Sequence, residues 1–249
     1  MNQEELVSAA IRSRQPTPIS ALVLDMDGLL VDSETVSGEA LRLFLAGHGH
    51  EMLPNTLEDA LGRRLPEAME VVAATYELPG PLEELVVAFD AMRLEALRGN
   101  VVAMVGAVEL LDWAAAKGLP RALATSSSRG QAEVALTEAA LMGRFDVEVT
   151  GDEVQLGKPA PDLFLLAAER LGVPPESCVV FEDAPAGLEA AARAGMRRVW
   201  VPNAHTRHLT SPVDVDARLE SLADAIGWLE SRGVSGTGSA REQPRRGGS

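Results

Sequence analysis

Short runs of apolar residues alternate with longer segments of helical periodicity along most of the chain. Apolar runs of roughly four to eight residues that end in turn residues are typical of strands buried in a sheet. Such runs occupy residues 21–26, 120–125, 145–150, 178–182 and 197–201. Amphipathic helical patterns occupy residues 107–116, 131–141, 162–171, 186–194 and 219–229. This alternation predicts an α/β fold in which helices cover both faces of a parallel sheet.

Residues 34–100 interrupt the alternation, because they contain helical patterns and no convincing strand. These helical patterns lie in residues 39–46, 65–76 and 82–97. A block of helices inserted after the first strand predicts a small helical cap domain over residues 34–100. The core domain is then discontinuous and consists of residues 18–33 and 101–232.

The two ends of the chain carry little pattern. Residues 1–17 are weakly patterned, and residues 233–249 are rich in Gly, Ser and Arg. Segments of this kind bury too little apolar surface to offset the entropy cost of ordering them. We therefore expect both ends to be disordered.

The chain is acidic, with a net charge of −15. A nucleic-acid-binding surface needs clustered basic residues, so we expect no nucleic-acid partner. No stretch approaches the roughly 18 apolar residues of a membrane span, and residues 1–20 lack the apolar region of a secretory signal. These observations predict a cytoplasmic protein without membrane contact, and no obligate protein partner is evident. The single cysteine, Cys178, cannot form an intrachain disulfide, and its apolar run predicts that it is buried.

The first predicted strand ends in two acids, Asp25 and Asp27, followed by Gly28. Side chains alternate along a strand, so both carboxylates are expected to point the same way. Two acids there are costly to desolvate unless a cation or a proton is shared between them. An aspartate that simply begins a turn is the alternative interpretation of this pair taken alone.

Polar residues follow three further predicted strands. Thr125, Ser126 and two more serines follow the second strand, Lys158 follows the third, and Glu182-Asp183 ends the fourth. In open α/β sheets, ligands bind beyond the carboxyl ends of the strands, so these groups are expected to meet there.

Each of these groups suits phosphoryl transfer. A carboxylate such as Asp25 can attack phosphorus, and Asp27 can then move the proton. Clustered acids suit Mg²⁺, which prefers oxygen ligands. Thr125 and the N–H groups that follow it can hold phosphate oxygens, and Lys158 can contact both the nucleophile and the phosphate.

Every one of these features also has a structural explanation. The serine run is compatible with a helix N-cap, Glu182-Asp183 with a solvated turn, and Lys158 with a solvated loop. Lys158 is one of only two lysines in a chain that otherwise uses arginine, which makes it weakly informative. The joint occurrence of all four features after separate strands favours the chemical interpretation.

The chain closely resembles the haloacid dehalogenase superfamily of phosphohydrolases over roughly residues 22–195. The motifs that carry the resemblance are DMDGLLVDSE from Asp25, LATSSS through Thr125, GKPAPD around Lys158 and VFEDAPAG around Glu182. The first motif is highly specific, whereas the second alone is weak. The resemblance implies a Rossmann-like core with a helical cap inserted after the first strand.

The resemblance also implies a role for each matching residue. Asp25 is the implied nucleophile and Asp27 the implied acid/base. The implied Mg²⁺ ligands are Asp25, the backbone carbonyl of Asp27, and Asp183, with Glu182 close or ligating. Thr125 and Lys158 are placed on the phosphate. Dehalogenase members lack the second aspartate, so Asp27 points to phosphate esters.

The branch that the chain resembles most contains phosphoglycolate phosphatases, sugar-phosphate phosphatases and β-phosphoglucomutase. Mutases of this branch carry a His on the first cap helix and a later cap arginine, where Ser37 and Leu65 stand here. Both departures favour hydrolysis. In the cap, Arg63 or Arg64 can reach the leaving group after the hinge-like Gly62, although exposed loop arginines are an equally good interpretation.

Three functions follow from the residues and the resemblance. The first is a Mg²⁺-dependent phosphatase that hydrolyses a small phosphorylated metabolite, such as a sugar phosphate or phosphoglycolate, through an aspartyl phosphate. The second is a phosphomutase on the same core. The third is a non-catalytic module that binds phosphate or metal.

Overall fold

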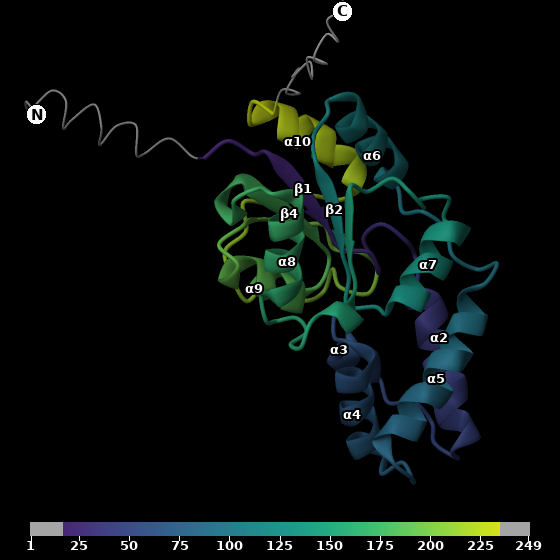
Figure 1. Ribbon diagram of the computed structural model, residues 1–249. Helices are drawn as coiled ribbons and strands as arrows, with labels where there is room; N and C mark the ends of the chain where they lie inside the picture. The colour runs from purple at the N-terminus through teal and green to yellow at the C-terminus, as the bar shows by residue number, and fades with distance from the viewer. Residues whose placement is uncertain (1–16, 235–249) are drawn as a thin grey trace, which may run out of the picture.

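The computed structural model describes residues 17–234, and Figure 1 shows a helix-covered sheet beside a separate group of helices. The predicted disorder of the chain ends falls almost wholly on residues 1–16 and 235–249, which lie outside the described range. Within that range, six parallel strands form one sheet in the order β3-β2-β1-β4-β5-β6. The strands are β1 (Ala21–Leu24), β2 (Arg121–Ala124), β3 (Val147–Val149), β4 (Cys178–Glu182), β5 (Arg197–Trp200) and β6 (Ala217–Arg218).

The order of the strands marks one end of β1 as a binding crevice. The chain adds β2 and β3 on one side of β1 and then β4, β5 and β6 on the other. Ligands bind in open α/β sheets where the strand order reverses in this way, beyond the carboxyl ends of the strands. Asp25 and Asp27 follow directly after β1 at this point.

Helices cover both faces of the sheet, which explains why its strands are continuous apolar runs rather than alternating ones. Leu22 and Leu24 pack in one apolar cluster with α6, α7 and α10, whereas Ala21 and Val23 pack in another with α8 and α9. All four side chains are completely buried. The covering helices are α6 (Ala107–Ala116), α7 (Arg129–Glu138), α8 (Asp162–Leu171), α9 (Pro185–Arg193) and α10 (Ala225–Ser231). Short 3-10 helices occupy Gly151–Glu153, Pro175–Ser177 and Leu222–Asp224.

The four helices between β1 and α6 form what we call the helical unit. They are α2 (Glu34–Gly47), α3 (Thr56–Ala60), α4 (Leu65–Tyr76) and α5 (Leu82–Leu97). This unit has its own apolar core, in which Leu45, Met69 and Phe89 are buried, distinct from the two clusters of the sheet. Figure 1 shows it at the end of the sheet where the strands finish at their carboxyl ends.

The predicted α/β fold with a parallel sheet and helices on both faces is confirmed. Three details differ from the sequence-based expectation. The two-residue strand β6 and the five-residue helix α3 were not expected, because neither is long enough to show a periodicity. The last helix begins at Ala225, because a 3-10 turn takes up residues 222–224 of the predicted amphipathic segment.

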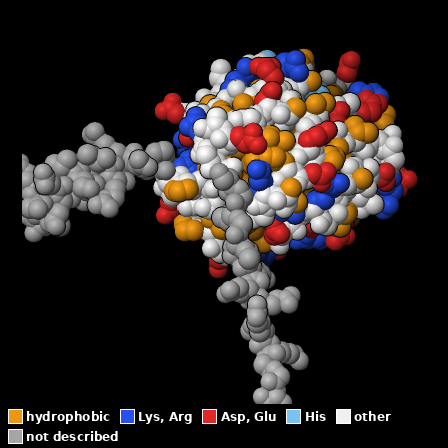
Figure 2. Space-filling view, turned by 90° about the horizontal axis from the view of Figure 1, so that it is seen from above, with side chains coloured by type: hydrophobic (Ala, Val, Ile, Leu, Met, Phe, Trp, Pro, Cys, Tyr) orange, Lys and Arg blue, Asp and Glu red, His pale blue; other side chains and the backbone are white. Residues whose placement is uncertain are grey.

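The surface is mixed in charge on the face that Figure 2 presents. Acidic and basic side chains are interspersed there rather than gathered into a patch of one sign. Among the helices of residues 17–234, none combines the length and the apolar character that a crossing of a membrane requires.

Candidate active site

Lys158 lies buried between two carboxylates that the sequence places far apart. Its Nζ donates to Asp25 Oδ1 at 2.5 Å and to Glu182 Oε1 at 2.7 Å. The lysine is 2% exposed, and the ring of Phe164 lies beneath its ammonium group at 4.9 Å. Burial lowers the pKa of this ammonium, but the two carboxylates outweigh burial and hold its pKa above its usual value. The alternative of a solvated loop lysine is therefore wrong.

Glu182 is held in place on both of its oxygens. Oε1 accepts from Lys158, and Oε2 accepts from the backbone N–H of Ala184 at 2.7 Å. The side chain also fills the space beside Gly187, where a Cβ would come within 1.6 Å of Oε1. The glycine of the VFEDAPAG motif is thus required by the close approach of Glu182 to α9.

Asp183 is the third acid of the cluster and is positioned from the loop after β5. Its Oδ2 accepts from Asn203 Nδ2 at 2.8 Å, and the same amide donates to the carbonyl of Gly28 at 3.0 Å. Gly28 has φ of 75°, and a Cβ there would lie 2.4 Å from Asn203 Nδ2 and 2.7 Å from Asp183 Oδ2. Glycine at this position therefore permits both the backbone turn and the approach of Asp183.

Asp25, Glu182 and Asp183 form a group that can hold a metal ion. Each offers a carboxylate oxygen, and these atoms lie within 4.8 Å of one another. Burial raises the pKa of Asp25 and of Asp183 well above the usual value, and mutual repulsion among the acids raises both further. Clustered buried carboxylates favour a bound cation, and an all-oxygen donor set fits a hard divalent ion. The residues present therefore fit the divalent ion expected from the sequence.

Asp27 has different hydrogen-bond partners from Asp25, although only one residue separates the two in the sequence. Its Oδ1 accepts from Ser33 Oγ at 2.5 Å, and its Oδ2 accepts from Ser127 Oγ at 2.7 Å and from Thr125 Oγ1 at 3.2 Å. Its side chain lies outside the acid group that can hold a metal. The structure thus gives the two acids of the first motif separate environments.

The serine run after β2 both caps a helix and contributes side chains to the candidate site. Ser128 caps α7, since its side chain accepts from the N–H of Gln131, whereas Thr125 and Ser127 donate to Asp27. Ser126 Oγ donates to the carbonyl of Gly62 at 2.9 Å and so links the core to the helical unit. Ser126 and Ser127 line the pocket, and Thr125 and Lys158 contact two of its lining acids, Asp27 and Asp25.

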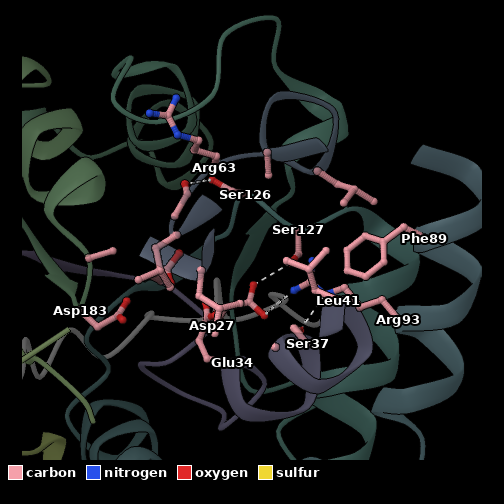
Figure 3. Close-up of a pocket in the computed structure, with 18 residues that line it drawn as sticks. Asp27, Glu34, Ser37, Leu41, Arg63, Phe89, Arg93, Ser126, Ser127 and Asp183 are labelled. Atoms are coloured by element: carbon pink, nitrogen blue, oxygen red, sulfur yellow. Dashed lines mark hydrogen bonds and ion pairs between the residues drawn. The ribbon is translucent and has the colours of Figure 1, made fainter. Parts of the chain in front are cut away.

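Arg93, on α5, reaches the site from the helical unit and was missed by the sequence analysis. Its Nη2 lies 3.4 Å from Asp27 Oδ1, its Nε donates to Ser37 Oγ at 2.8 Å, and its Nη1 donates to Gln131 Oε1 at 3.2 Å. Figure 3 shows Arg93, Ser37 and Ser127 gathered around Asp27. No local pattern separates this arginine from others on amphipathic helices, so its role depends on the packing of α5.

Asn203 was also missed, but a signal for it exists. It follows β5 just as Asp25, Thr125 and Asp183 follow their own strands. A search of every strand end for amide side chains, and not only for acids and hydroxyls, would have found it.

The two candidate arginines of the helical unit lie in different places. Arg64 bridges Glu67 and the backbone carbonyl of Val154, the latter at 2.9 Å, so it joins the helical unit to the core. Arg63 lines the outer edge of the pocket, and Figure 3 shows its guanidinium pointing away from Asp27.

Glu34, at the start of α2, is a further acid of the pocket. Burial, together with the negative charge of Asp27, raises its pKa from 4.5 to about 7, against the opposing effect of Arg93. Four acids thus line a pocket that also holds Arg63 and Arg93: Asp25, Asp27, Glu34 and Asp183. Acids therefore outnumber arginines in this pocket, which favours a bound cation when an anionic substrate enters.

Comparisons with known proteins identify the family of this chain. The family model described as haloacid dehalogenase-like hydrolase matches residues 19–195. The chain is 37% identical to a probable pseudouridine-5'-phosphatase of Drosophila melanogaster, over 83% of this chain and 91% of that one. It is 35% identical to the fructose-1-phosphate phosphatase YqaB of Escherichia coli, over 73% and 96% of the two chains.

A solved structure has the same arrangement of elements. The crystal structure of CbbY from Rhodobacter sphaeroides in complex with phosphate superposes with a TM-score of 0.76 at 28% identity. The match covers 83% of this chain and 96% of that one. The family model spans the ends of β1, β2 and β4, which carry Asp25, Thr125 and Asp183. The chain therefore belongs to the haloacid dehalogenase-like hydrolases.

Proposed function

We propose that this protein is a Mg²⁺-dependent phosphatase that hydrolyses a small phosphorylated metabolite through an aspartyl phosphate on Asp25. The observation that carries the proposal is the separation of partners between Asp25 and Asp27. Asp25 is paired with Lys158 inside the acid cluster, as a nucleophile near a cation should be. Asp27 is held outside that cluster by hydroxyl groups, as a proton carrier should be. Two relatives that are named as phosphatases support the proposed hydrolysis of a phosphate ester.

The first half of the reaction transfers the phosphoryl group to the enzyme. A carboxylate oxygen of Asp25 attacks phosphorus and the ester P–O bond breaks, while Asp27 gives its proton to the departing alkoxide. Burial raises the pKa of Asp25 and Lys158 acts to lower it. A bound cation would favour the ionised carboxylate further. The hydroxyls of Ser33 and Ser127 hold the carboxyl group of Asp27 toward the leaving oxygen.

The second half regenerates the enzyme. Asp27, now a carboxylate, removes a proton from water, and the water oxygen attacks phosphorus. The bond between phosphorus and Asp25 breaks, which releases inorganic phosphate and restores both side chains. Ser126, Thr125 and Lys158 are the proposed contacts of the phosphoryl group, and Arg63 is a proposed contact at the outer edge of the pocket.

The proposed Mg²⁺ ligands are Asp25, Asp183 and the backbone carbonyl of Asp27, with Glu182 close by. The bound ion would neutralise negative charge so that an anionic carboxylate can approach an anionic phosphate. Both oxygens of Glu182 already accept hydrogen bonds, which supports its role as a support for Lys158 more than as a principal ligand.

The helical unit is proposed to act as a cap that selects the substrate and excludes water during the reaction. Its contacts with the core through Arg93, Arg64 and Ser126 support this role. Where mutases of the resembling branch carry a histidine, Ser37 here accepts a hydrogen bond from Arg93. This arrangement favours hydrolysis over phosphoryl return to the substrate. We place the activity in the cytoplasm.

The test is phosphate release from a panel of phosphorylated metabolites by wild type, Asp25→Asn and Glu84→Gln, with Mg²⁺ and with EDTA. We expect wild type and Glu84→Gln to be active only with Mg²⁺, because Glu84 is exposed on α5. Asp25→Asn is expected to be inactive and to lack the phosphorylated Asp25 peptide that rapid acid quenching should trap from wild type.

Two results would contradict the proposal. Turnover by Asp25→Asn at the wild-type rate would exclude Asp25 as the nucleophile. Conversion of β-glucose 1-phosphate to glucose 6-phosphate without release of inorganic phosphate would identify a mutase instead.

A further inference from the structure

The turn between α3 and α4 joins the helical unit to the crevice at the ends of the strands. The carbonyl of Gly62 accepts from Ser126 Oγ, in the loop after β2, at 2.9 Å. Arg64 Nη1 donates to the carbonyl of Val154, in the loop after β3, also at 2.9 Å. A Cβ on Gly62 would lie 3.3 Å from the Cβ of Ala184, in the loop after β4. One short turn of the helical unit thus contacts three of the loops that carry the candidate site.

Arg64 is held in a fixed orientation by an acid in the first turn of α4. Its Nε and Nη2 donate to Glu67 Oε1 at 2.9 and 2.5 Å, while its Nη1 donates to Val154. The two side chains of this ion pair are only 20% and 30% exposed. A guanidinium is rigid and planar, so its donors point in set directions. Arg64 and Glu67 therefore form one firm surface of the helical unit against the loop after β3.

Gly157 lies against this surface, where there is no room for a side chain. A Cβ there would come within 2.7 Å of Glu67 Oε2, 2.8 Å of Arg64 Cγ and 2.9 Å of Arg64 Nε. Its φ is not positive, so the backbone conformation alone does not require glycine. Gly157 is buried, and the next residue in the chain is Lys158. The close approach of Arg64 and Glu67 thus explains the glycine of the GKPAPD motif in this chain.

The contacts of Arg64 bear directly on the position of Lys158. The lysine Nζ fits between two carboxylates at 2.5 and 2.7 Å, and its side chain is 1% exposed. Arg64 restrains the segment before it at both ends, through the hydrogen bond at Val154 and through packing at Gly157. A shift of this segment would move the backbone of Lys158, and a displacement of about 1 Å in an active site can cost about 100-fold in rate. The helical unit is thus connected to the lysine of the site through one turn and one loop.

We propose that Arg64 is a positioning residue, which fixes the segment 154–157 and so holds Lys158 against Asp25 when the helical unit packs on the core. This inference rests on the proposed phosphatase function and adds a residue to its mechanism. Arg64 acts through Lys158 and does not touch the reacting atoms. Its loss should therefore lower kcat, whereas loss of a residue that only attached the helical unit would lower stability or raise KM.

Substitution of Arg64 by methionine tests this role. Arg64→Met keeps a long unbranched side chain and removes every donor, so the protein should still fold. The assay uses Mg²⁺ with p-nitrophenyl phosphate and with the best substrate of the panel above. We expect kcat to fall about tenfold and KM to change less than about twofold. Arg64→Lys should recover part of kcat, since its ammonium can still donate to Val154 but lacks the fork that also binds Glu67.

Arg42→Met is the matched control. Arg42 also pairs with a glutamate three residues away, Glu39, but this pair lies within α2 and the side chain of Arg42 is 49% exposed. The control thus loses the same side chain and the same type of ion pair from the helical unit. Exposed pairs of this kind contribute little, so kcat and KM should stay at their wild-type values.

A double-mutant cycle tests whether Arg64 and Gly157 act through each other. Gly157→Ala places a Cβ against Arg64, so it should lower kcat about tenfold in the wild-type background. Of the three atoms nearest to that Cβ, Arg64→Ala leaves only Glu67 Oε2, at the end of a flexible side chain. In the Arg64→Ala background, Gly157→Ala should therefore lower kcat less than about threefold, because substitutions at contacting residues are not additive.

The outcomes separate this inference from the phosphatase itself. Wild-type kcat in Arg64→Met, with only a lower melting temperature or a higher KM, would overturn the positioning role and leave the phosphatase intact. An equal effect of Gly157→Ala in both backgrounds would do the same. No Mg²⁺-dependent release of phosphate by wild type from any substrate would overturn both proposals.

Discussion

The guanidinium Nη2 of Arg93 lies 3.4 Å from the carboxylate Oδ1 of Asp27 and connects the helical unit to the first motif. Each side chain of this pair is 14% exposed, so solvent screens the interaction only weakly. Because Arg93 belongs to α5, Asp27 has this partner only while the helical unit packs against the core. The pair therefore couples the position of the helical unit to the orientation of the proposed acid/base.

Arg93→Ala should lower kcat by roughly 10- to 100-fold, because small displacements of a catalytic group are costly. Arg93→Lys should restore little, since one ammonium cannot bind Asp27, Ser37 and Gln131 with the geometry of a guanidinium fork. Steady-state kinetics with an accepted phosphate ester would measure both. Arg98→Ala is the control, because Arg98 is 62% exposed near the same helix end. Wild-type kcat in Arg93→Ala would show that the pair has no part in catalysis.

Lys158→Arg should lower kcat/KM by about 100-fold, although the charge is kept, because a planar guanidinium does not fit between Asp25 and Glu182.

Lys158→Ala leaves both buried acids unpaired and should destabilise the protein by about 3–5 kcal/mol. Activity assays and chemical denaturation measure the two effects. The control is Lys117→Arg, at the other lysine, which lies over the ring of Trp113. If Lys158→Arg were as active as wild type, Lys158 would have no contact with the reacting atoms.

Gly187→Ala should destabilise the protein by about 1–3 kcal/mol, because the new Cβ would meet Glu182 and force it to move. Displaced Glu182 no longer supports Lys158, so activity should fall with stability. Gly130→Ala is a matched control in α7, where a Cβ meets nothing within 4 Å. This control should be stabilising by about 0.5–1 kcal/mol, from helix propensity. Equal melting temperatures of the two variants would contradict the predicted approach of Glu182.

The raised pKa of Glu34 predicts that its contribution to protein stability changes with pH. Its pKa is raised from 4.5 to about 7 on folding, so the folded protein keeps a proton between these values that the unfolded chain has released. The contribution of Glu34 to the free energy of unfolding therefore decreases as pH rises from 4.5 to about 7 and stays lower above that range. Glu34→Gln removes this effect and should stabilise the metal-free protein at pH 8 by up to about 3 kcal/mol.

Thermal unfolding in EDTA at pH 5 and at pH 8 measures this difference. Near pH 5 the two proteins should unfold at nearly the same temperature, and at pH 8 the variant should be more stable. Glu39→Gln is the control, because Glu39 is exposed on the same helix and Arg42 lowers its pKa. A gain that is as large at pH 5 as at pH 8 would contradict titration of Glu34 as the cause.

The sequence by itself determined the parallel sheet without its two-residue strand β6, and most of the polar groups at the strand ends. Buried parallel strands are apolar on both faces, so β1 and β4 are visible as continuous runs, and polar residues that interrupt such runs at their ends are equally visible. For this reason the pattern of residues alone is enough to place Asp25, Lys158 and Asp183 at one crevice. The order of the strands was not predicted, and the structure supplies it.

Only the tertiary structure decided which partners these groups have. Asp25 and Asp27 are two residues apart, yet one pairs with Lys158 and the other with Ser33, Ser127 and Arg93. Arg93, Leu41 and Leu65 lie on helices whose periodicity fixes a buried face but not what that face meets. Contacts between distant segments depend on how the helical unit packs on the core, and that packing is a property of the whole chain rather than of any local pattern.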